Sequence, residues 1–570
     1  MGGVGWQPAQ PRDLEFEGAG AQADPGEHAA GAAGLPARPA EDEPAGVGLA
    51  AQRPTPVGPR TDPAAQRICE RRERAQRSLP ARLGFADASD GVRALAERLA
   101  PDGQLSAADV QALVVEAGDF GRITEGERQA LLELMRERAA ELAPSARAAL
   151  AGVLGIPLQP VAGGSGRGAP GPPYGSPEFE RQLDRDTQSV ARPDNEVRLL
   201  FDGVQSFAER RKLIENATDS IHLQTFIFTA DETGWELAKL LAAKAQQGVK
   251  VRVIYDGLGS ARSGQEIFEY MRRHGVEVRE YGDPLRQFWD LNNRWHEKYL
   301  IVDGQAAITG GMNIANEYAF GGSGRMVLSR GQQGTEPWRD VDIRLQGPVV
   351  HDVQRAFLKN WQELGPPVSP GEQERLFPPP ALTPGGPRAR FVQHRPDEDG
   401  DENTTALYLH AIRSAEESIT IENAYFIPPP AVRQALIEAA RRGVQVRVLT
   451  NSRASNDMGM VSDAARYYYD ELIAAGVQIY EKQGGTLHSK TATFDGRYSI
   501  VGSVNMNGRS DTLDSEGAVA VEDAATAATL QRRFAEGLGQ AQAVTAAELD
   551  REGFFTNLKQ WALSLLSWTF

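Results

Sequence analysis

Two short segments of this chain carry the same polar residues at the same spacing. Counted from each histidine, a lysine follows at position +2, an aspartate at +7, two small residues at +14 and +15, and an asparagine at +17. The first copy contains His296, Lys298, Asp303, Gly310, Gly311 and Asn313, and the second contains His488, Lys490, Asp495, Gly502, Ser503 and Asn505. A repeat of this kind, 192 residues apart, predicts two similar lobes with a shared site where they meet.

These residue types suit the chemistry of a phosphodiester, which is anionic and resists nucleophilic attack. A catalyst must neutralise phosphate oxygens, supply a nucleophile and protonate the leaving alkoxide. One neutral imidazole can attack phosphorus and form a phosphohistidine while the other, as imidazolium, donates a proton, and the roles then reverse. Lys298 and Lys490 supply positive charge and Asn313 and Asn505 supply neutral donors, so these four residues are predicted to bind the phosphate without a metal.

Both copies resemble the HxK(x)4D motif of the phospholipase D superfamily, and residues 195–538 more narrowly resemble bacterial cardiolipin synthases. The resemblance implies transfer of a phosphatidyl group between phospholipids through a phosphohistidine, with a phosphatidylglycerol-like substrate and no cofactor. The catalytic residues that the resemblance implies are His296, Lys298, Asp303, His488, Lys490 and Asp495.

The resemblance also implies roles for residues around the motifs. Asp340 and Glu516 correspond to carboxylates that hold the imidazoles, so that the attacking nitrogen of each ring is the unprotonated one. The usual pattern of the family favours His296 as nucleophile and His488 as acid.

A second interpretation stays open for the two motif aspartates. Asp303 and Asp495 lie in Val-Asp-Gly and Phe-Asp-Gly segments, which favour strand-to-turn positions and a role in stabilising the scaffold. Two further positions depart from the family pattern: Gln224 stands where glutamate is frequent, and Asn507 where aspartate is common. These departures question the tuning of the site, not its reaction.

Other functions remain as alternatives. The same site could hydrolyse phospholipid headgroups with water as acceptor, and a chain with a silent site could serve as a lipid-surface binding module. A phosphodiesterase acting on nucleic acid is disfavoured, because the net charge is −16 and nucleic-acid binders normally present basic surface. We therefore expect no nucleic-acid partner.

Composition bounds the environment of the protein. The single cysteine, Cys69, excludes internal disulfides and a cysteine-based metal cluster. No run of 18 apolar residues is present, which argues against a membrane-spanning helix, and the first residues do not read as a secretory signal. The expected location is therefore cytoplasmic with peripheral membrane association, and the oligomeric state is left open.

Patterning along the chain predicts an α/β protein in which two lobes follow a disordered tract and a small helical module. Strand-like segments at 220–226 and 249–255 flank a helix at 235–246, and 418–426, 432–442 and 443–449 repeat this order. The alternation predicts a mixed, mostly parallel sheet flanked by helices in each lobe. The expected ranges are a disordered tract (1–84), a helical module (85–155), a Gly/Pro linker (156–190), lobe 1 (191–366), a Pro-rich linker (367–400), lobe 2 (401–548) and an amphipathic C-terminal helix (549–570).

Three segments outside the repeats have open interpretations. Residues 98–109 and 116–127 faintly resemble EF-hand loops, but too few oxygen ligands remain for tight calcium binding. The insertion at 321–333 could shape substrate access or be a tolerated surface loop. The apolar face of 549–570 could lie at a membrane interface or pack against the lobes.

Overall fold

The computed structural model describes residues 170–282, 293–320, 338–396, 398, 401–549, 551, 559 and 560. The expected N-terminal tract, helical module and EF-hand-like loops, the 321–333 insertion and most of the C-terminal helix lie outside these described residues. Among the residues that the structure describes, no helix has both the length and the apolar character to span a bilayer.

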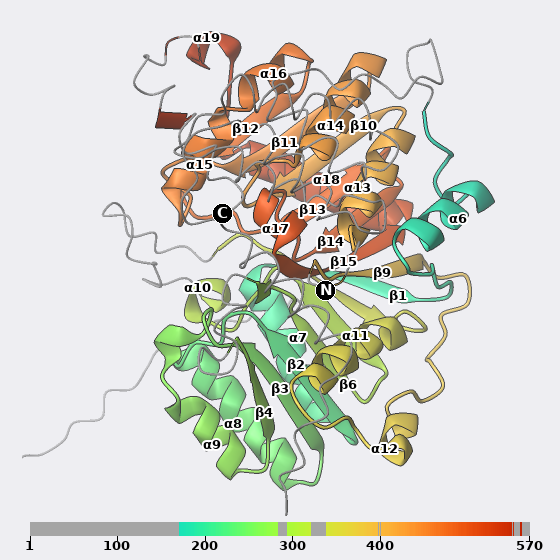
Figure 1. Cartoon of the computed structure of the whole chain (residues 1–570), viewed down its shortest axis with the longest axis vertical. Helices are drawn as coiled ribbons and strands as arrows, with labels where there is room; N and C mark the ends of the chain where they lie inside the picture. The colour runs from blue at the N-terminus through green and yellow to red at the C-terminus, as the bar shows by residue number, and fades with distance from the viewer. Residues whose placement is uncertain are drawn as a thin grey trace, which may run out of the picture. The chain divides into compact units, whose positions relative to one another are not determined.

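The first lobe is built on a seven-stranded sheet in the order β1-β8-β7-β6-β2-β3-β4 (Figure 1). Its strands are β1 (Glu196–Phe201), β2 (Ser220–Thr225), β3 (Lys250–Asp256), β4 (Glu277–Tyr281), β6 (Tyr299–Val302), β7 (Ala306–Gly310) and β8 (Val341–Gln346). Its helices are α7 (Asp202–Asn216), α8 (Glu232–Gln246), α9 (Glu266–Arg273), α10 (Asn316–Ala319) and α11 (Val350–Glu363).

Alternation along strand β6 explains why helices cover both faces of this sheet. Successive side chains of a strand point to opposite faces. Leu300 and Val302 join the apolar core under α7, α8 and α9, whereas Tyr299 and Ile301 join a second core with α11. A strand buried on both faces must be apolar at every position, as β6 is.

The second lobe repeats the plan on a larger sheet in the order β16-β12-β11-β10-β13-β14-β15-β5, with β9 also paired to β15. The strands of this sheet are β9 (Arg388–His394), β10 (Ser418–Asn423), β11 (Gln445–Asn451), β12 (Gln478–Lys482), β13 (Lys490–Phe494), β14 (Tyr498–Gly502), β15 (Asp514–Glu522) and β16 (Ala541–Ala543), and β5 (Arg294–Trp295), which the first lobe contributes to its edge. The helices of the second lobe are α13 (Asn403–Ser414), α14 (Pro430–Arg442), α15 (Gly459–Arg466), α16 (Tyr469–Ala474), α17 (Gly508–Thr512), α18 (Ala524–Leu538) and α19 (Ala546–Leu549).

Local sequence sets the limits of the equivalent helices α8 and α14. The Asp231 side chain accepts a hydrogen bond from the Gly234 N–H and caps the start of α8. Pro430 occupies the first turn of α14, where a missing N–H does no harm, and Gly443 ends that helix in the left-handed conformation at φ 103°.

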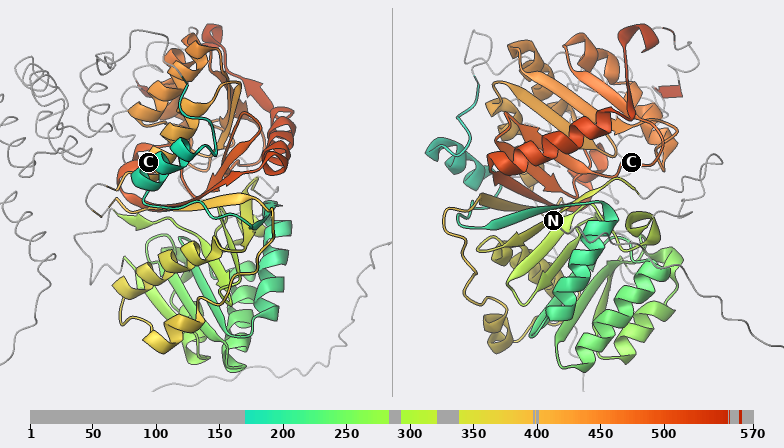
Figure 2. Two further views of the ribbon diagram at one scale, coloured as in Figure 1. Left: turned by 90° about the vertical axis from the view of Figure 1, so that its right-hand side faces the viewer. Right: turned by 180° about the vertical axis from the view of Figure 1, so that it is seen from behind.

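One apolar core belongs to both lobes. It contains Ile343 and Leu345 from β8 and Phe357 from α11, together with Val501 from β14 and Val519 from β15. Strand β15 pairs with β9 where the lobes meet, and α18, the long red helix across the upper lobe in Figure 2 (right), packs on the second sheet chiefly against β13 and β14. The joint between the lobes is therefore packed like a protein interior.

The α/β fold with two lobes is confirmed, but the expectation of mostly parallel sheets is wrong. Two of the six strand pairings in the first sheet are parallel, and three of the eight in the second. The motif strands β6 and β13 each turn back through three residues into β7 and β14, and so short a connection can only join antiparallel neighbours.

Both expected linkers contain regular structure. Residues 367–400 include α12 (Pro370–Arg375) and β9, which pairs along most of β15 as part of the second sheet. Residues 156–190 include α6 (Pro177–Asp186), whose Phe179 and Leu183 are buried in the core of the second lobe. Proline-rich composition indicated linkers, but described apolar residues of both stretches are packed: those of α6 in the core of the second lobe, and Val368 and Leu376 beside α11 of the first lobe.

The two motif aspartates lie in the β6–β7 and β13–β14 turns. Asp303 accepts hydrogen bonds from the Asp219 and Ser220 N–H groups at 2.8 and 2.9 Å. Asp495 accepts from the Glu417 and Ser418 N–H groups at 2.8 Å. Both have positive φ, 52° and 48°, which aspartate tolerates better than most residues.

These contacts favour the scaffold interpretation of Asp303 and Asp495, and their implied catalytic role stays a prediction. Each aspartate lies five residues of extended chain after its motif lysine, a distance of roughly 16 Å. Asp303 binds the backbone at the start of β2, and Asp495 binds the backbone at the start of β10. The scaffold interpretation of the two aspartates fits the hydrogen bonds.

Replacing Asp303 or Asp495 by asparagine should therefore weaken folding more than catalysis. Each change removes part of a carboxylate that accepts several backbone N–H groups, so the free energy of unfolding should fall by about 1–3 kcal/mol. Denaturant unfolding measures this, with Asp470→Asn on the exposed side of α16 as control. A large loss of turnover with unchanged stability would contradict the assignment.

Candidate functional site

Backbone pairing between the lobes positions both histidines. Strand β5 pairs in parallel with the start of β15, and the His296 N–H donates to the Ser515 carbonyl at 2.9 Å. In the equivalent place, Leu487 forms a parallel bridge with Arg339, and the His488 N–H donates to the Arg339 carbonyl at 2.7 Å. Each histidine thus extends from a segment that is held by the other lobe.

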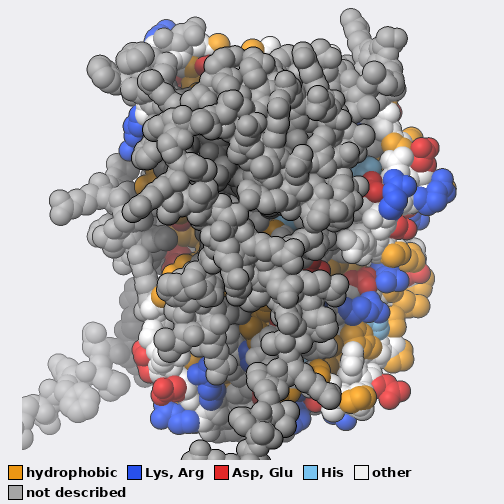
Figure 3. Space-filling model, in the orientation of Figure 1, with side chains coloured by type: hydrophobic (Ala, Val, Ile, Leu, Met, Phe, Trp, Pro, Cys, Tyr) orange, Lys and Arg blue, Asp and Glu red, His pale blue; other side chains and the backbone are white. Residues whose placement is uncertain are grey.

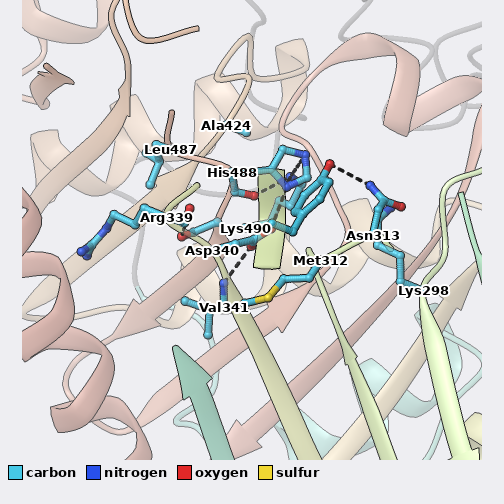
Figure 4. Close-up of polar contacts among 12 residues, drawn as sticks. Lys298, Met312, Asn313, Arg339, Asp340, Val341, Ala424, Leu487, His488 and Lys490 are labelled. Carbon is cyan, nitrogen blue, oxygen red and sulfur yellow. Dashed lines mark hydrogen bonds and ion pairs between the residues drawn. The ribbon is translucent and has the colours of Figure 1, made fainter. Parts of the chain in front are cut away.

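The orienting carboxylates are exchanged between the lobes. His296 Nδ1 lies 3.0 Å from both carboxylate oxygens of Glu516. His488 Nδ1 lies 2.7 Å from Asp340 Oδ2, and Figure 4 shows these two side chains. Because a carboxylate accepts, it favours the proton on Nδ1 and leaves a lone pair on Nε2 for chemistry. The Ser503 and Ser510 hydroxyls donate to Glu516 at 2.5 and 2.6 Å and hold it in place.

Both motif lysines are buried beside the imidazoles. Lys490 Nζ lies 3.0 Å from His488 Nδ1 and 3.1 Å from Nε2, and Lys298 Nζ donates to the His296 carbonyl. Burial lowers the pKa of Lys298 to about 7 and that of Lys490 to about 8, and repulsion from Lys490 contributes to the shift of Lys298. Figure 4 shows Lys298 and Asn313 on one side of the site and Lys490 and His488 on the other.

The two motif asparagines differ in their hydrogen bonds. Asn313 Oδ1 accepts from the Ile227 N–H at 3.0 Å, and its Nδ2 donates to the Tyr318 hydroxyl at 2.9 Å, so among the described residues its second amide hydrogen has no acceptor. Asn505 is buried, and its Oδ1 has no hydrogen-bond partner within the described residues. Their predicted role as phosphate donors remains a prediction.

Aromatic rings that the sequence comparison of the two motifs did not single out surround the imidazoles. The Phe226 ring centroid lies 5.2 Å from that of His296, and Tyr318 and Trp338 lie 5.2 and 5.3 Å from His488. Phe226 lies directly after β2, but the position directly after β10 is Ala424, so the repeat held no signal for this ring. Tyr318 and Trp338 have no counterpart either.

Burial and neighbouring charges set the protonation of the site. Burial, followed by the positive lysines, lowers the pKa of both imidazoles well below 6.5, so both are neutral at rest. Burial raises the pKa of Asp340 and Glu516 to about 7. The two halves are unequal, because Arg509 further lowers the pKa of His296 whereas Asp457 opposes the lowering for His488.

The two departures from the family pattern lie in the scaffold. Gln224 donates to Glu297 Oε2 at 2.7 Å and accepts from Asn360 at 3.0 Å, in a buried polar network around Glu297. Asn507 caps α17 by accepting from the Ser510 N–H at 2.9 Å, as aspartate would. Neither residue replaces a reacting group.

Within the described ranges, no group of three or more His, Cys, Asp or Glu side chains is arranged to hold a metal ion. The chemistry that this arrangement supports is attack on a phosphodiester by one imidazole, with the second imidazole moving protons and two ammonium groups offsetting phosphate charge.

Comparison with known proteins agrees with this geometry. A family profile described as "Cardiolipin synthase, PLD-like domain" matches residues 211–320 and 408–538, one segment in each lobe. The chain is 30% identical over 377 residues to a probable cardiolipin synthase of Bacillus subtilis, covering 65% of this chain and 71% of that protein. It is 31% identical over 382 residues to a cardiolipin synthase of Listeria monocytogenes, covering 66% and 76%.

Among solved structures, the phosphatidylserine synthase of Haemophilus influenzae matches with a TM-score of 0.52 at 14% identity, over 69% of this chain and 100% of that chain. At this identity the likeness concerns the fold, which is that of phospholipase D-like proteins. With the sequence relatives, it follows that the chain belongs to the cardiolipin synthase family.

The lowered lysine pKa values predict an alkaline loss of activity. An ammonium group is charged below its pKa and neutral above it, so kcat/KM, which reports the free enzyme, should fall as the pH rises from about 7 to about 9. A pH–rate profile with circular dichroism at each pH tests this. A profile that stays flat to about pH 9.5, near ordinary lysine behaviour, would show that the lysines are not the groups involved.

Proposed function

We propose that this protein is a phosphatidyltransferase that moves a phosphatidyl group from one phospholipid to a hydroxyl group of another, as its cardiolipin synthase relatives do by name. The observation that carries the proposal is the pair of buried imidazoles, each held through Nδ1 by a carboxylate of the opposite lobe. The proposed substrate is a phosphatidylglycerol-like lipid, and contact with the membrane surface is proposed because both substrates reside there.

In the first proposed step, His296 Nε2 forms a bond to the donor phosphorus, and the phosphorus–oxygen bond to the headgroup breaks. His488 gives its proton to the leaving alkoxide. The bound phosphate supports this protonation state, because its negative charge offsets the nearby lysines and raises the pKa of His488. Lys298 and Lys490 balance the charge that develops on the phosphate oxygens.

In the second proposed step, His488 takes the proton of the acceptor hydroxyl, and the hydroxyl oxygen bonds to phosphorus while the bond to His296 breaks. Histidine, lysine and carboxylate return to their starting states, so no cofactor is consumed. Phe226, Tyr318 and Trp338 around the imidazoles exclude bulk water, which supports transfer to an alcohol over hydrolysis.

The inequality of the two halves supports the assignment of roles. Arg509 favours a neutral imidazole at His296, which suits a nucleophile, and Asp457 favours a protonated imidazole at His488, which suits an acid. The alternative of nucleic-acid cleavage has less support: the net charge is −16, and on the described surface visible in Figure 3 acidic and basic side chains are interspersed.

Leaving-group dependence tests the roles of the two histidines. With phosphatidyl-p-nitrophenol the leaving phenolate needs little protonation, so Asp340→Asn, which weakens His488, should retain the rate of the first-turnover burst of p-nitrophenol within about tenfold. Later turnovers should slow, because His488 is also the base of the second step. The same variant should lose at least about 10²-fold with phosphatidylglycerol, whereas Glu516→Gln should lose that much with both donors. If Glu516→Gln instead retained p-nitrophenol release and Asp340→Asn lost it, His488 would be the nucleophile and His296 the acid.

Incubation with phosphatidylglycerol vesicles in EDTA, followed by mass spectrometry of the lipids, tests the function. Cardiolipin should form, and His296→Asn and His488→Asn should each lower its rate by at least about 10³-fold, because each removes a reacting group. Asp470→Asn, on the exposed part of α16, is the control. Phosphatidic acid as the only product would identify a hydrolase, and absence of any product would overturn the proposal.

A further inference from the structure

A carboxylate that neither motif contains lies on the His488 side of the site. Asp457 follows β11 in the loop before α15, and it is half-buried. Its Oδ1 and Oδ2 lie 2.7 and 2.9 Å from the hydroxyl of Tyr425, which is also half-buried. A carboxylate can accept about four hydrogen bonds, so this contact leaves capacity for another donor.

One buried amide fixes this pair relative to His488. Asn451 Nδ2 donates to the Ala424 carbonyl at 3.1 Å and to the Leu487 carbonyl at 2.7 Å, and Asn451 Oδ1 accepts from the Leu487 N–H at 2.9 Å. These contacts tie together the residues that directly precede Tyr425 and His488. Figure 4 shows Ala424 and Leu487 close to His488.

The loop that carries Asp457 is attached to the same amide. The Ser455 hydroxyl lies 3.1 Å from Asn451 Oδ1 and 2.9 Å from the Lys482 carbonyl, and Asn456 donates to the Ser462 hydroxyl at 2.8 Å. The loop that carries Asp457 is therefore fixed relative to Leu487, the residue that directly precedes His488.

The charge of Asp457 indicates which part of a lipid it would contact. A carboxylate repels a phosphate group, so its place in a phosphodiester site is on the side of the alcohol. In the proposed function, His488 protonates the leaving alcohol and deprotonates the entering one, so both alcohols occupy the space next to it. A glycerol headgroup has a second hydroxyl beside the reacting one, which can donate to a carboxylate.

We propose, resting on the phosphatidyltransferase function above, that Asp457, oriented by Tyr425, binds the non-reacting hydroxyl of a glycerol headgroup and so selects a polyol over water as acceptor. The contact places the acceptor oxygen for deprotonation by His488. Water has no second hydroxyl group and gains nothing from the contact, so the carboxylate acts as a specificity-determining residue for transfer over hydrolysis.

Partitioning of the phosphoenzyme tests the proposal. With phosphatidyl-p-nitrophenol as donor, the wild type is given glycerol, ethanol or ethanolamine, and the ratio of transfer product to phosphatidic acid is measured. This ratio is independent of the rate of the first step, so a general loss of activity cancels. Circular dichroism and thermal melting check that each variant is folded.

Asp457→Asn and Asp457→Ala should lower the glycerol ratio at least about tenfold, because a hydrogen bond to a charged group is lost. Tyr425→Phe, which frees the carboxylate but keeps it, should lower the ratio by a smaller factor of about three. The ethanol ratio should change by less than about twofold, since ethanol has only the reacting hydroxyl. Asp470→Asn, which removes the same charge from the exposed part of α16, should leave all ratios unchanged.

Three results would overturn the proposal while the wild type still transfers. These are an unchanged glycerol ratio in both Asp457 variants, an equal fall for glycerol and ethanol, and a fall confined to ethanolamine, which would assign Asp457 to an ammonium group. If the wild type uses neither lipid donor, the proposed function fails and this inference fails with it. The two failures are therefore distinguishable.

Discussion

The rest of the site depends on the exchange of carboxylates across the joint between the lobes. Glu516 of the second lobe holds His296 of the first, and Asp340 of the first holds His488 of the second. All four groups are buried. When a buried ionisable group loses its partner, the folded protein is destabilised by several kcal/mol. Any sliding of one lobe against the other would remove both imidazole partners at once.

Two features keep the lobes from sliding. The backbone beside each histidine pairs with the backbone beside the carboxylate it uses, through β5 with β15 and through Leu487 with Arg339. The apolar core shared by β8, α11, β14 and β15 lies directly behind these pairings. Directional hydrogen bonds thus set the register, and burial of apolar area holds the lobes together.

The sequence was sufficient to predict which histidines and lysines lie at the joint between the lobes, because the repeat keeps these residues at matched offsets. The sequence did not reveal that each histidine uses the carboxylate of the other lobe. Asp340 lies nearer in sequence to His296, but the partner of His296 is Glu516. Strand direction was misjudged although Asp303-Gly304 and Asp495-Gly496 are dipeptides that favour hairpin turns. Tyr318 and Trp338 could not be found from the repeat, because the second lobe has no equivalent of them.

Gln224 and Asn507 show that the role of a residue cannot be inferred from its type alone when its contacts are unknown. Both looked like changes close to the chemistry, yet Gln224 completes a hydrogen-bond network around Glu297, and Asn507 caps the helix that supplies Ser510 to Glu516. The neighbours of Gln224 come from distant parts of the chain, whereas the contact of Asn507 is a local helix cap. Sequence spacing alone does not contain that information.

The unequal surroundings of the two imidazoles have a consequence for the direction of substrate binding. A site assembled from two identical subunits would present the same neighbours to both rings, and a lipid could then bind in two opposite orientations of equal energy. Covalent fusion of the halves allows Arg509 to stand near one ring and Asp457 near the other. This chain can therefore bind its donor in one preferred orientation. A twofold-symmetric assembly cannot do so, because its two binding orientations have equal energy.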